Sequence, residues 1–166
     1  MCLYQGVIRT TKHVFFYQTE IGKIGISENG EAITHLYFEH ETIPDDALVK
    51  ETPLLKEAAG QLQSYLSGKR KEFTIPLAPS GTEFMQQVWK YLLSIPYGET
   101  RTYQEAADSL NKPNGFRAIG LANHRNPIPI FIPCHRVIAA DGTLAGYRGG
   151  VPVKAMLLQI EQEGSS

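Results

Sequence analysis

The chain has 166 residues, of which 42% are hydrophobic and 20% are charged, so it is long enough to bury a core as one domain or as two small ones. No apolar run approaches the ~20 residues that a membrane-spanning helix needs. The first six residues, Met-Cys-Leu-Tyr-Gln-Gly, also lack the charged and apolar regions of a signal peptide. We therefore expect a cytoplasmic protein without a membrane segment.

The net charge of −1 argues against a uniformly basic surface that coats nucleic acid. The charge is unevenly distributed, however, because residues 101–154 contain seven Lys or Arg against three Asp or Glu, a local charge of +4. This bias fits either a local basic face or a set of scattered, solvated charges.

The two cysteines, Cys2 and Cys134, are too few for a disulfide framework. Zinc would need three or four ligands at a recognisable spacing. Besides the adjacent Cys134 and His135, the chain offers only four scattered histidines: His13, His35, His40 and His124. No glycine-rich loop has the spacing of a phosphate-binding motif. The sequence therefore predicts a reduced, free Cys134, no metal and no organic cofactor.

Residues 13–39 have the pattern of an antiparallel meander, in which apolar runs alternate with turn residues. Asn29-Gly30 predicts one of the hairpin turns, because both residues tolerate positive φ. Residues 40–51 are acidic and predict an exposed loop. Residues 73–77 are a further extended piece that can return to the meander.

A helix is expected from Pro53, which suits the first helical position, to about Ser67, where Gly68 stops it. The stretch Ala-Pro-Ser-Gly at residues 78–81 follows the extended piece at residues 73–77 and has the composition of a linker. We therefore expect a domain boundary there, with an amino-terminal support domain at residues 1–79 and a second domain at residues 80–166.

The second half has mostly helical periodicity. Residues 84–95 have one apolar face at helical spacing, and Thr102 and Glu105 match a capping box that begins a short helix. A further helix is expected from Phe116 to His124. Two short helices joined by one turn are typical of a helix-turn-helix.

The apolar spacing also predicts which helical side chains face the core. In the helix from Phe116 the expected inward residues are Phe116, Ile119 and Leu121. A last helix opens at Pro152 and should end before Gly164, with its core face formed by Val153, Met156, Leu157 and Ile160. The fold class is α+β, with an antiparallel sheet and helix first and a mostly helical domain second.

The most informative stretch runs from Asn126 to Val137 and reads Asn-Pro-Ile-Pro-Ile-Phe-Ile-Pro-Cys-His-Arg-Val. Its apolar part predicts a short buried strand, which the prolines confine to a sheet edge or an irregular extended path. At its end, the Cys134 thiol is followed at once by His135 and Arg136. An imidazole and a guanidinium can each lower a cysteine pKa and so raise its thiolate fraction.

A buried cysteine taken alone is by default a small apolar filler. Here Glu161 lies at the margin of the buried face of the last helix, where its carboxylate can orient His135. The arrangement predicts a relay of Cys134, His135 and Glu161. Because adjacent residues of a strand point to opposite faces, proton transfer between Cys134 and His135 needs a turn at Cys134 or a bridging water.

The helix at residues 116–124 can either pack as an ordinary core helix or face nucleic acid. Its polar residues include Arg117, Asn123 and His124, with Arg125 just beyond, and its small residues allow close approach of a backbone. Small residues favour the minor groove or the phosphates, and an arginine can replace a base that has left the stack.

Three motifs together resemble the methylated-DNA–protein-cysteine methyltransferases, also called 6-O-alkylguanine-DNA alkyltransferases. They are Asn126-Pro127 with Ile-Pro-Cys-His-Arg-Val, the upstream Arg-Ala-Ile-Gly at residues 117–120, and the downstream Tyr-Arg-Gly-Gly at residues 147–150. The resemblance spans about residues 80–163. It implies a ribonuclease-H-like amino-terminal domain and direct transfer of an alkyl group from 6-O-alkylguanine, and from 4-O-alkylthymine, in duplex DNA to Cys134, once per molecule.

The resemblance also implies roles in catalysis. Cys134 matches the alkyl acceptor, His135 the residue that deprotonates it through a water, and Glu161 the carboxylate that orients His135. Asn126 matches a hinge between the recognition helix and the active-site strand. Tyr103 matches a residue that lies beside the rotated phosphate and assists the leaving guanine.

Further positions match DNA contacts of the family. Arg117 matches the finger that enters the duplex in place of the flipped nucleotide. The pocket that holds the flipped base matches the Val137 carbonyl and Tyr147. The remaining residues expected to face DNA are Ala118, Gly120, Asn123 and Arg125. No role is assigned to Arg148. The expected partner is double-stranded DNA, bound by a monomer.

Two other classes of function fit part of the pattern. One is a DNA-binding regulator that binds lesions without repairing them or in which Cys134 only senses alkylation or oxidation. The other is a cysteine hydrolase using Cys134 and His135, for which no oxyanion-hole motif is visible.

Overall fold

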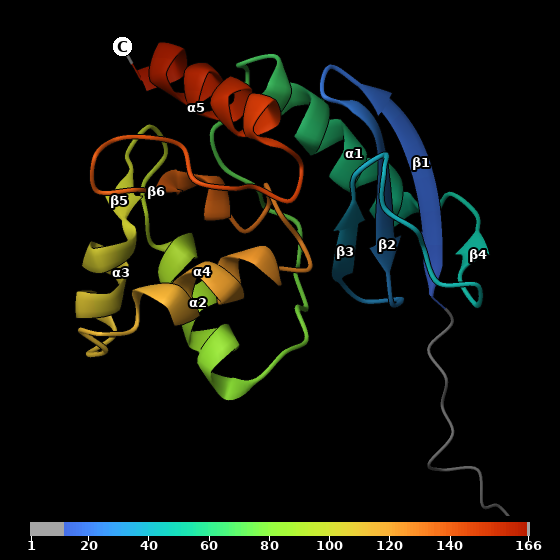
Figure 1. Ribbon diagram of the computed structural model, residues 1–166. Coiled ribbons are helices and arrows are strands. Elements are labelled where there is room, and N and C mark those ends of the chain that lie inside the picture. The colour runs from blue at the N-terminus through green and yellow to red at the C-terminus, as the bar shows by residue number, and fades with distance from the viewer. Residues whose placement is uncertain (1–11, 166) are drawn as a thin grey trace, which may run out of the picture.

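The computed structural model describes residues 12–165, so Cys2 and the rest of residues 1–11 lie outside the described part. Figure 1 shows a small sheet covered by helix α1, beside a group formed by helices α2 to α5. The predicted α+β fold class is confirmed. No helix within residues 12–165 is both long and apolar enough to cross a membrane.

The predicted meander is present. Strands β1 (His13–Thr19), β2 (Gly22–Glu28) and β3 (Ile33–Tyr37) pair in antiparallel order. In the turn between β2 and β3 the Asn29 side chain accepts two backbone N–H groups, and Gly30 has a φ of +98°. Gly30 therefore takes the positive φ that the sequence predicted, whereas Asn29 is not at positive φ and instead stabilises the turn through its side chain.

Both edges of the meander gain a further partner. The loop expected at residues 40–51 contains a short strand that its composition did not indicate: β4 (Leu48–Val49) pairs in parallel with β1, which gives the order β3-β2-β1-β4. At the other edge the extended piece before Ala78 returns as expected. There the Ile33 N–H donates to the Pro76 carbonyl at 2.9 Å, and the Ile33 carbonyl accepts from the Ala78 N–H at 2.8 Å.

Helix α1 (Pro53–Leu66) covers one face of the sheet. The Thr52 side chain caps it by accepting the Leu55 N–H at 3.2 Å, and Gly68 takes a φ of +80° just after its end. These are the start and stop signals that the sequence contains. The buried face of α1 includes Tyr65, whose side chain is fully buried.

The second half contains α2 (Glu83–Leu93), α3 (Tyr103–Ser109) and α4 (Phe116–His124). Both halves of the capping box that begins α3 are formed, since Thr102 Oγ1 accepts the Glu105 N–H at 3.0 Å and Glu105 Oε1 accepts the Thr102 N–H at 2.9 Å. Helices α3 and α4 pack against each other across one turn, as expected for a helix-turn-helix.

The prediction that Phe116 and Leu121 point inward is wrong. Their side chains are 48% and 47% exposed, whereas Ile119 and Ala122 are buried. Leu121 is two residues from Ile119, which places it on a different side of the helix, and Phe116 is the first residue of α4, at the margin of the core. The surface of α4 is therefore partly apolar.

Helix α5 (Val151–Ser165) also differs from expectation. Met156 is 39% exposed, and Gly164 lies inside the helix, where the Tyr97 hydroxyl packs so closely that a Cβ would lie 2.5 Å from it. The buried side chains are Lys154, Leu157 and Glu161. Their spacing of three and four residues forms one stripe, and two of the three are charged.

The strand predicted before Cys134 is absent. The segment is buried as expected, but it forms tight turns in which the Ile132 N–H donates to the Ile128 carbonyl at 2.9 Å and Ile130 has a φ of +75°. Prolines remove ladder donors, and the turns replace the missing ladder. A β-branched residue at positive φ is strained, so the surrounding core must hold Ile130 in place.

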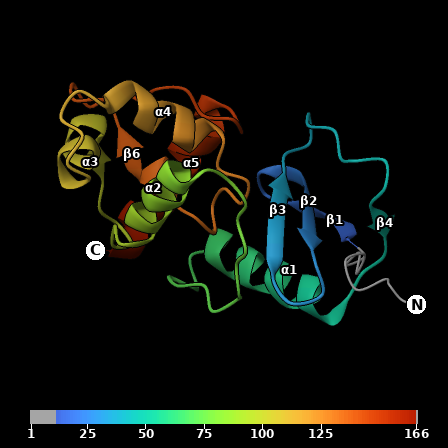
Figure 2. The same ribbon diagram turned by 90° about the horizontal axis from the view of Figure 1, so that it is seen from below.

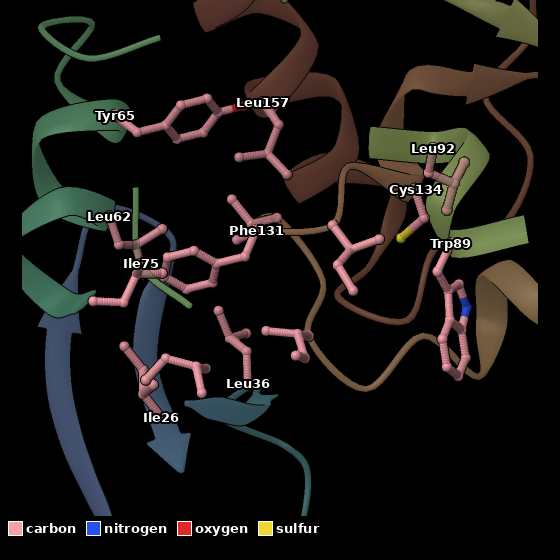
Figure 3. Close-up of a cluster of buried hydrophobic side chains, with 14 of the residues drawn as sticks. Ile26, Leu36, Leu62, Tyr65, Ile75, Trp89, Leu92, Phe131, Cys134 and Leu157 are labelled. Carbon is pink, nitrogen blue, oxygen red and sulfur yellow. The ribbon is translucent and has the colours of Figure 1, made fainter. Parts of the chain in front are cut away.

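The two halves share one core. Figure 2 shows the sheet and α1 on one side and the helices on the other, and the buried side chains of Figure 3 connect them without a break. Phe73 packs against Phe131 with ring centroids 4.6 Å apart, and the Leu36 N–H donates to the Pro127 carbonyl at 2.9 Å. The amino-terminal half is therefore in direct contact with the segment that leads to Cys134.

Candidate active site

Cys134 is the first residue of a short 3₁₀ helix, η2 (Cys134–Arg136), which follows Pro133 directly. Strand β6 (Val137–Ile138) comes next and pairs in parallel with β5 (Arg101–Thr102), so the start of α3 lies beside the cysteine. A turn rather than a strand thus holds the thiol, and Cys134 and His135 need not face opposite sides.

Asn126 is fully buried, and its side chain holds the backbone of the segment that leads to Cys134. Its Nδ2 donates to the Ile132 carbonyl at 2.8 Å, and its Oδ1 accepts the Ile128 N–H at 3.0 Å. The same side chain hydrogen-bonds the Cys134 thiol. One amide therefore connects the end of α4 to the turns of the segment and to the sulfur.

His135 and Glu161 form a buried pair. His135 Nε2 lies 2.7 Å from Glu161 Oε2, and His135 Nδ1 is buried with no hydrogen-bond partner within residues 12–165. If Nε2 carries the proton that the carboxylate accepts, Nδ1 presents a lone pair. Burial lowers the pKa of His135, and Glu161 raises it only in part, so the ring is neutral near pH 7 and able to accept a proton.

Glu161 accepts hydrogen bonds from four residues. Besides His135, its carboxylate accepts the Tyr65 hydroxyl at 2.5 Å, Arg136 Nε at 2.8 Å and Nη2 at 3.1 Å, and the Gly98 N–H at 3.1 Å. Burial by itself would raise the pKa of Glu161, but His135 and Arg136 outweigh burial and bring it to about 2. The carboxylate is therefore charged at any physiological pH.

The surroundings of the Cys134 thiol have opposing effects on its pKa. Burial raises the pKa of Cys134, while the Asn126 hydrogen bond and the positive charges of Arg148 and Lys154 lower it in part. Arg136, which the sequence suggested for this role, instead binds Glu161 and donates Nη1 to the Ile95 carbonyl. The free protein therefore keeps the thiol protonated near pH 7 and needs a base to form the thiolate.

A pocket of about 30 Å³ leads to Cys134. It has room for about two water molecules, since each needs ~10–15 Å³. A wider hollow of about 490 Å³ adjoins it, and the two share Tyr103, Gly120 and Tyr147 in their walls. The pocket as it stands has room for a bridging water but not for a purine ring. A nucleobase would therefore have to displace part of the wall to reach the thiol.

Two polar side chains of this wall have no partner. Both amide atoms of Asn123 and the hydroxyl of Tyr147 are buried without a hydrogen bond in the described part of the chain. Burial, and then the neighbouring Cys134, raise the pKa of Tyr147 far above its ordinary value, so its hydroxyl keeps its proton. Buried polar atoms without a partner are costly, and these can pair with a ligand that enters the pocket.

The residues expected to contact DNA lie in three places. Arg117 and Ala118 are exposed on α4, and Gly120 faces Tyr103 at the mouth of the pocket. Arg125 instead lines a separate groove of about 790 Å³ between the two halves.

The Val137 carbonyl, which the resemblance places at the base, accepts a hydrogen bond from Lys154 Nζ at 2.8 Å.

Three residues near the site were not found from the sequence. Tyr65 reaches Glu161 from α1, Arg148 joins the halves by donating to the Leu36 and Asn126 carbonyls, and Lys154 lies buried near the thiol. Only Lys154 had a local signal, because it lies three residues before Leu157 on the core stripe of α5. Within residues 12–165 no three His, Cys or carboxylate side chains are grouped to hold a metal ion.

Two family models match the chain. The ribonuclease-like domain of the 6-O-methylguanine DNA methyltransferases matches residues 13–79, and the DNA binding domain of the same family matches residues 83–163. Together these models account for most of the sequence and agree with the fold described above.

Individual relatives agree with the family models. The methylated-DNA–protein-cysteine methyltransferase of Methanosarcina barkeri is 48% identical over 149 residues, covering 87% of this chain and 94% of the relative. The constitutive one of Bacillus subtilis is 45% identical over 152 residues, covering 87% and 92%. The crystal structure of Mycobacterium tuberculosis OGT in complex with DNA has a TM-score of 0.86 at 42% identity, covering 92% of this chain and 94% of that one. The chain therefore belongs to the 6-O-methylguanine DNA methyltransferase family.

Proposed function

We propose that this protein repairs DNA in the cytoplasm as a monomer, by moving the alkyl group of 6-O-alkylguanine, and of 4-O-alkylthymine, from duplex DNA to Cys134. The observation that carries the proposal is the position of the thiol, at the inner end of a pocket that opens beside α4 and next to a buried His135–Glu161 pair. The names of the relatives support the reaction type.

The first step is removal of the thiol proton. His135 Nδ1 is buried and has no hydrogen-bond partner within residues 12–165, so it is the base that takes the proton through a bridging water. Glu161 holds the opposite ring nitrogen and stabilises the imidazolium that forms. Arg148 and Lys154 are the positive charges close to the new thiolate.

The second step is the transfer. The Cys134 sulfur attacks the alkyl carbon, a sulfur–carbon bond forms, and the carbon–oxygen bond breaks with its electron pair going to the guanine oxygen. The leaving guanine takes up a proton, for which the Tyr103 hydroxyl at the pocket wall is the proposed donor. The product is a thioether, which has no leaving group of comparable quality, so each molecule reacts once.

A stacked base cannot reach a thiol that is 5% exposed, so the nucleotide must leave the duplex. This costs a few kcal/mol, and less for a damaged base. The exposed Arg117 is the proposed replacement for the base, and Ala118 and Gly120 let the phosphate backbone approach α4. Residues 80–166 are the proposed DNA-binding and transfer domain and residues 1–79 the support domain.

The test is a duplex with one labelled 6-O-methylguanine, offered in excess to the protein and to Cys134→Ser. We expect one equivalent of label on the wild-type protein, none on the variant, and equal binding of the duplex by both. Binding without transfer by the wild-type protein would favour a lesion-binding regulator, and more than one equivalent released would indicate a hydrolase. Loss of binding in the variant would mean that Cys134 is structural.

A further inference from the structure

Tyr65 brings a polar group from the amino-terminal half into the active site. It belongs to α1, is fully buried, and points toward α5 beside Leu157 (Figure 3). Its hydroxyl lies 2.5 Å from Glu161 Oε2 and 3.2 Å from His135 Nε2. The same carboxylate oxygen that holds the His135 ring is therefore held by Tyr65.

Packing alone does not explain the hydroxyl. The Tyr65 ring contacts Phe73 at 5.2 Å and Tyr97 at 6.2 Å between centroids, and a phenylalanine ring would make the same contacts. A buried hydroxyl is costly unless it is hydrogen-bonded, and the neighbours that satisfy it are Glu161 and His135.

We propose that Tyr65 is a positioning residue for alkyl transfer: its hydroxyl fixes Glu161 Oε2 and lowers the proton affinity of the His135–Glu161 pair, so that the amino-terminal half completes the active site. This goes beyond support, the role given to that half above. Figure 1 shows α5 passing beside the end of α1, and the Tyr65 hydroxyl of α1 hydrogen-bonds Glu161 of α5 at this place.

The sign of the effect follows from the distances. Tyr65 donates its single proton to Oε2 at 2.5 Å, whereas the contact of its oxygen with His135 Nε2 is longer, at 3.2 Å. Donation to the carboxylate withdraws negative charge that would otherwise stabilise the imidazolium, and it outweighs the weaker acceptance from Nε2. Without the hydroxyl, Glu161 becomes a stronger acceptor and the pKa of His135 rises.

The charged and titratable groups that face His135 come from three elements. Glu161 and Lys154 face it from α5, Arg136 from η2 and Tyr65 from α1. Arg136 and Lys154 oppose a positive charge on the ring and Glu161 favours it. Because these three remain in a Tyr65→Phe variant, a change in the titration of His135 is assigned to the hydroxyl.

The matched control is Tyr97→Phe. It makes the same chemical change next to Tyr65, but the Tyr97 hydroxyl donates to the Ile160 backbone carbonyl at 3.3 Å and not to the carboxylate. The measured quantities are the titration of His135 by NMR with labelled histidine, which needs no substrate, and the pH profile of transfer from a 6-O-methylguanine duplex.

For Tyr65→Phe we expect the protonation constant of His135 to rise about threefold or more, while Tyr97→Phe leaves it unchanged. The transfer rate should fall at low pH and approach the wild-type rate at high pH, since His135 must be neutral to act as a base. Incorporation of 3-fluorotyrosine at position 65, a stronger donor, should move the titration in the opposite direction and keeps the test decisive if Tyr65→Phe folds poorly.

An unchanged His135 titration in Tyr65→Phe, or an equal change in Tyr97→Phe, would overturn the inference, as would a rate lowered equally at all pH values. The kinetic measurement rests on the proposed function, whereas the titration does not. A shifted titration together with absent transfer in the wild-type protein would therefore contradict the proposed function alone.

Discussion

Glu161 is a buried carboxylate on which both the stability of the fold and the proposed proton transfer depend. Its carboxylate accepts from Tyr65, His135, Arg136 and the Gly98 N–H. Glu161→Gln keeps the shape but removes the charge, and it turns one oxygen into an NH₂ group that faces donors. Arg136, only 8% exposed, then keeps its charge without a counter-ion.

The magnitude follows from burial. Breaking a buried ion pair by removing one partner costs about 3–5 kcal/mol. At about 2–4 °C per kcal/mol for a chain of this size, the melting temperature should fall by about 6–20 °C. Since the folded pKa of Glu161 is about 2, against an ordinary value of 4.5, its contribution is fully present above 4.5 and is lost as the pH falls through 2.

The assay is urea unfolding of wild type and Glu161→Gln at pH 7 and at several lower pH values, with exposed Glu31→Gln as the control. We expect the stability gap between wild type and variant to be largest near pH 7 and to narrow toward pH 3. A loss below about 1 kcal/mol at pH 7, the size of a surface ion pair, would refute the reasoning that the Glu161–Arg136 pair is buried and essential.

Two further substitutions separate DNA contacts from interdomain contacts. Arg117→Ala should slow transfer from a paired lesion far more than transfer from free 6-O-benzylguanine, measured as second-order rate constants, and equal losses would contradict insertion into the duplex. Arg148→Ala should lower the free energy of unfolding by about 1–3 kcal/mol, because the carbonyls of Leu36 and Asn126 lose their shared donor. Arg125→Ala is the control, because Arg125 is exposed and lines the same groove between the two halves as Arg148, and it should change stability little. Equal losses of stability in the two variants would contradict the reasoning that Arg148 holds the two halves together.

Local signals in the sequence predicted much of the fold. Pro53 and Gly68 bound α1, the Asn29-Gly30 pair forms its turn, and the capping box at Thr102 begins α3. Each depends only on neighbours within a few residues, which a single sequence contains.

The turns before Cys134 could not be predicted in the same way. An apolar run interrupted by prolines is compatible with an extended path or with turns, and only tertiary packing selects the positive φ of Ile130.

The sequence also pointed to the group of Cys134, His135 and Glu161, but not to the other residues that contact it. Cys134 and His135 are adjacent and Glu161 lies on a recognisable helix face, so this group was accessible to reasoning on spacing. Tyr65 is 96 residues from Glu161, and Arg148 joins a carbonyl 112 residues away. No local pattern encodes contacts at such separations, and both depend on how the two halves pack.

The most direct test of alkyl transfer is the mass of the peptide that contains Cys134, measured after reaction with an excess of duplex carrying 6-O-methylguanine. We expect this peptide to gain a single methyl group on the sulfur, while the duplex recovers one unmodified guanine for each protein molecule. An unmodified Cys134 peptide, or a methyl group on another residue, would contradict the assignment of Cys134 as the acceptor.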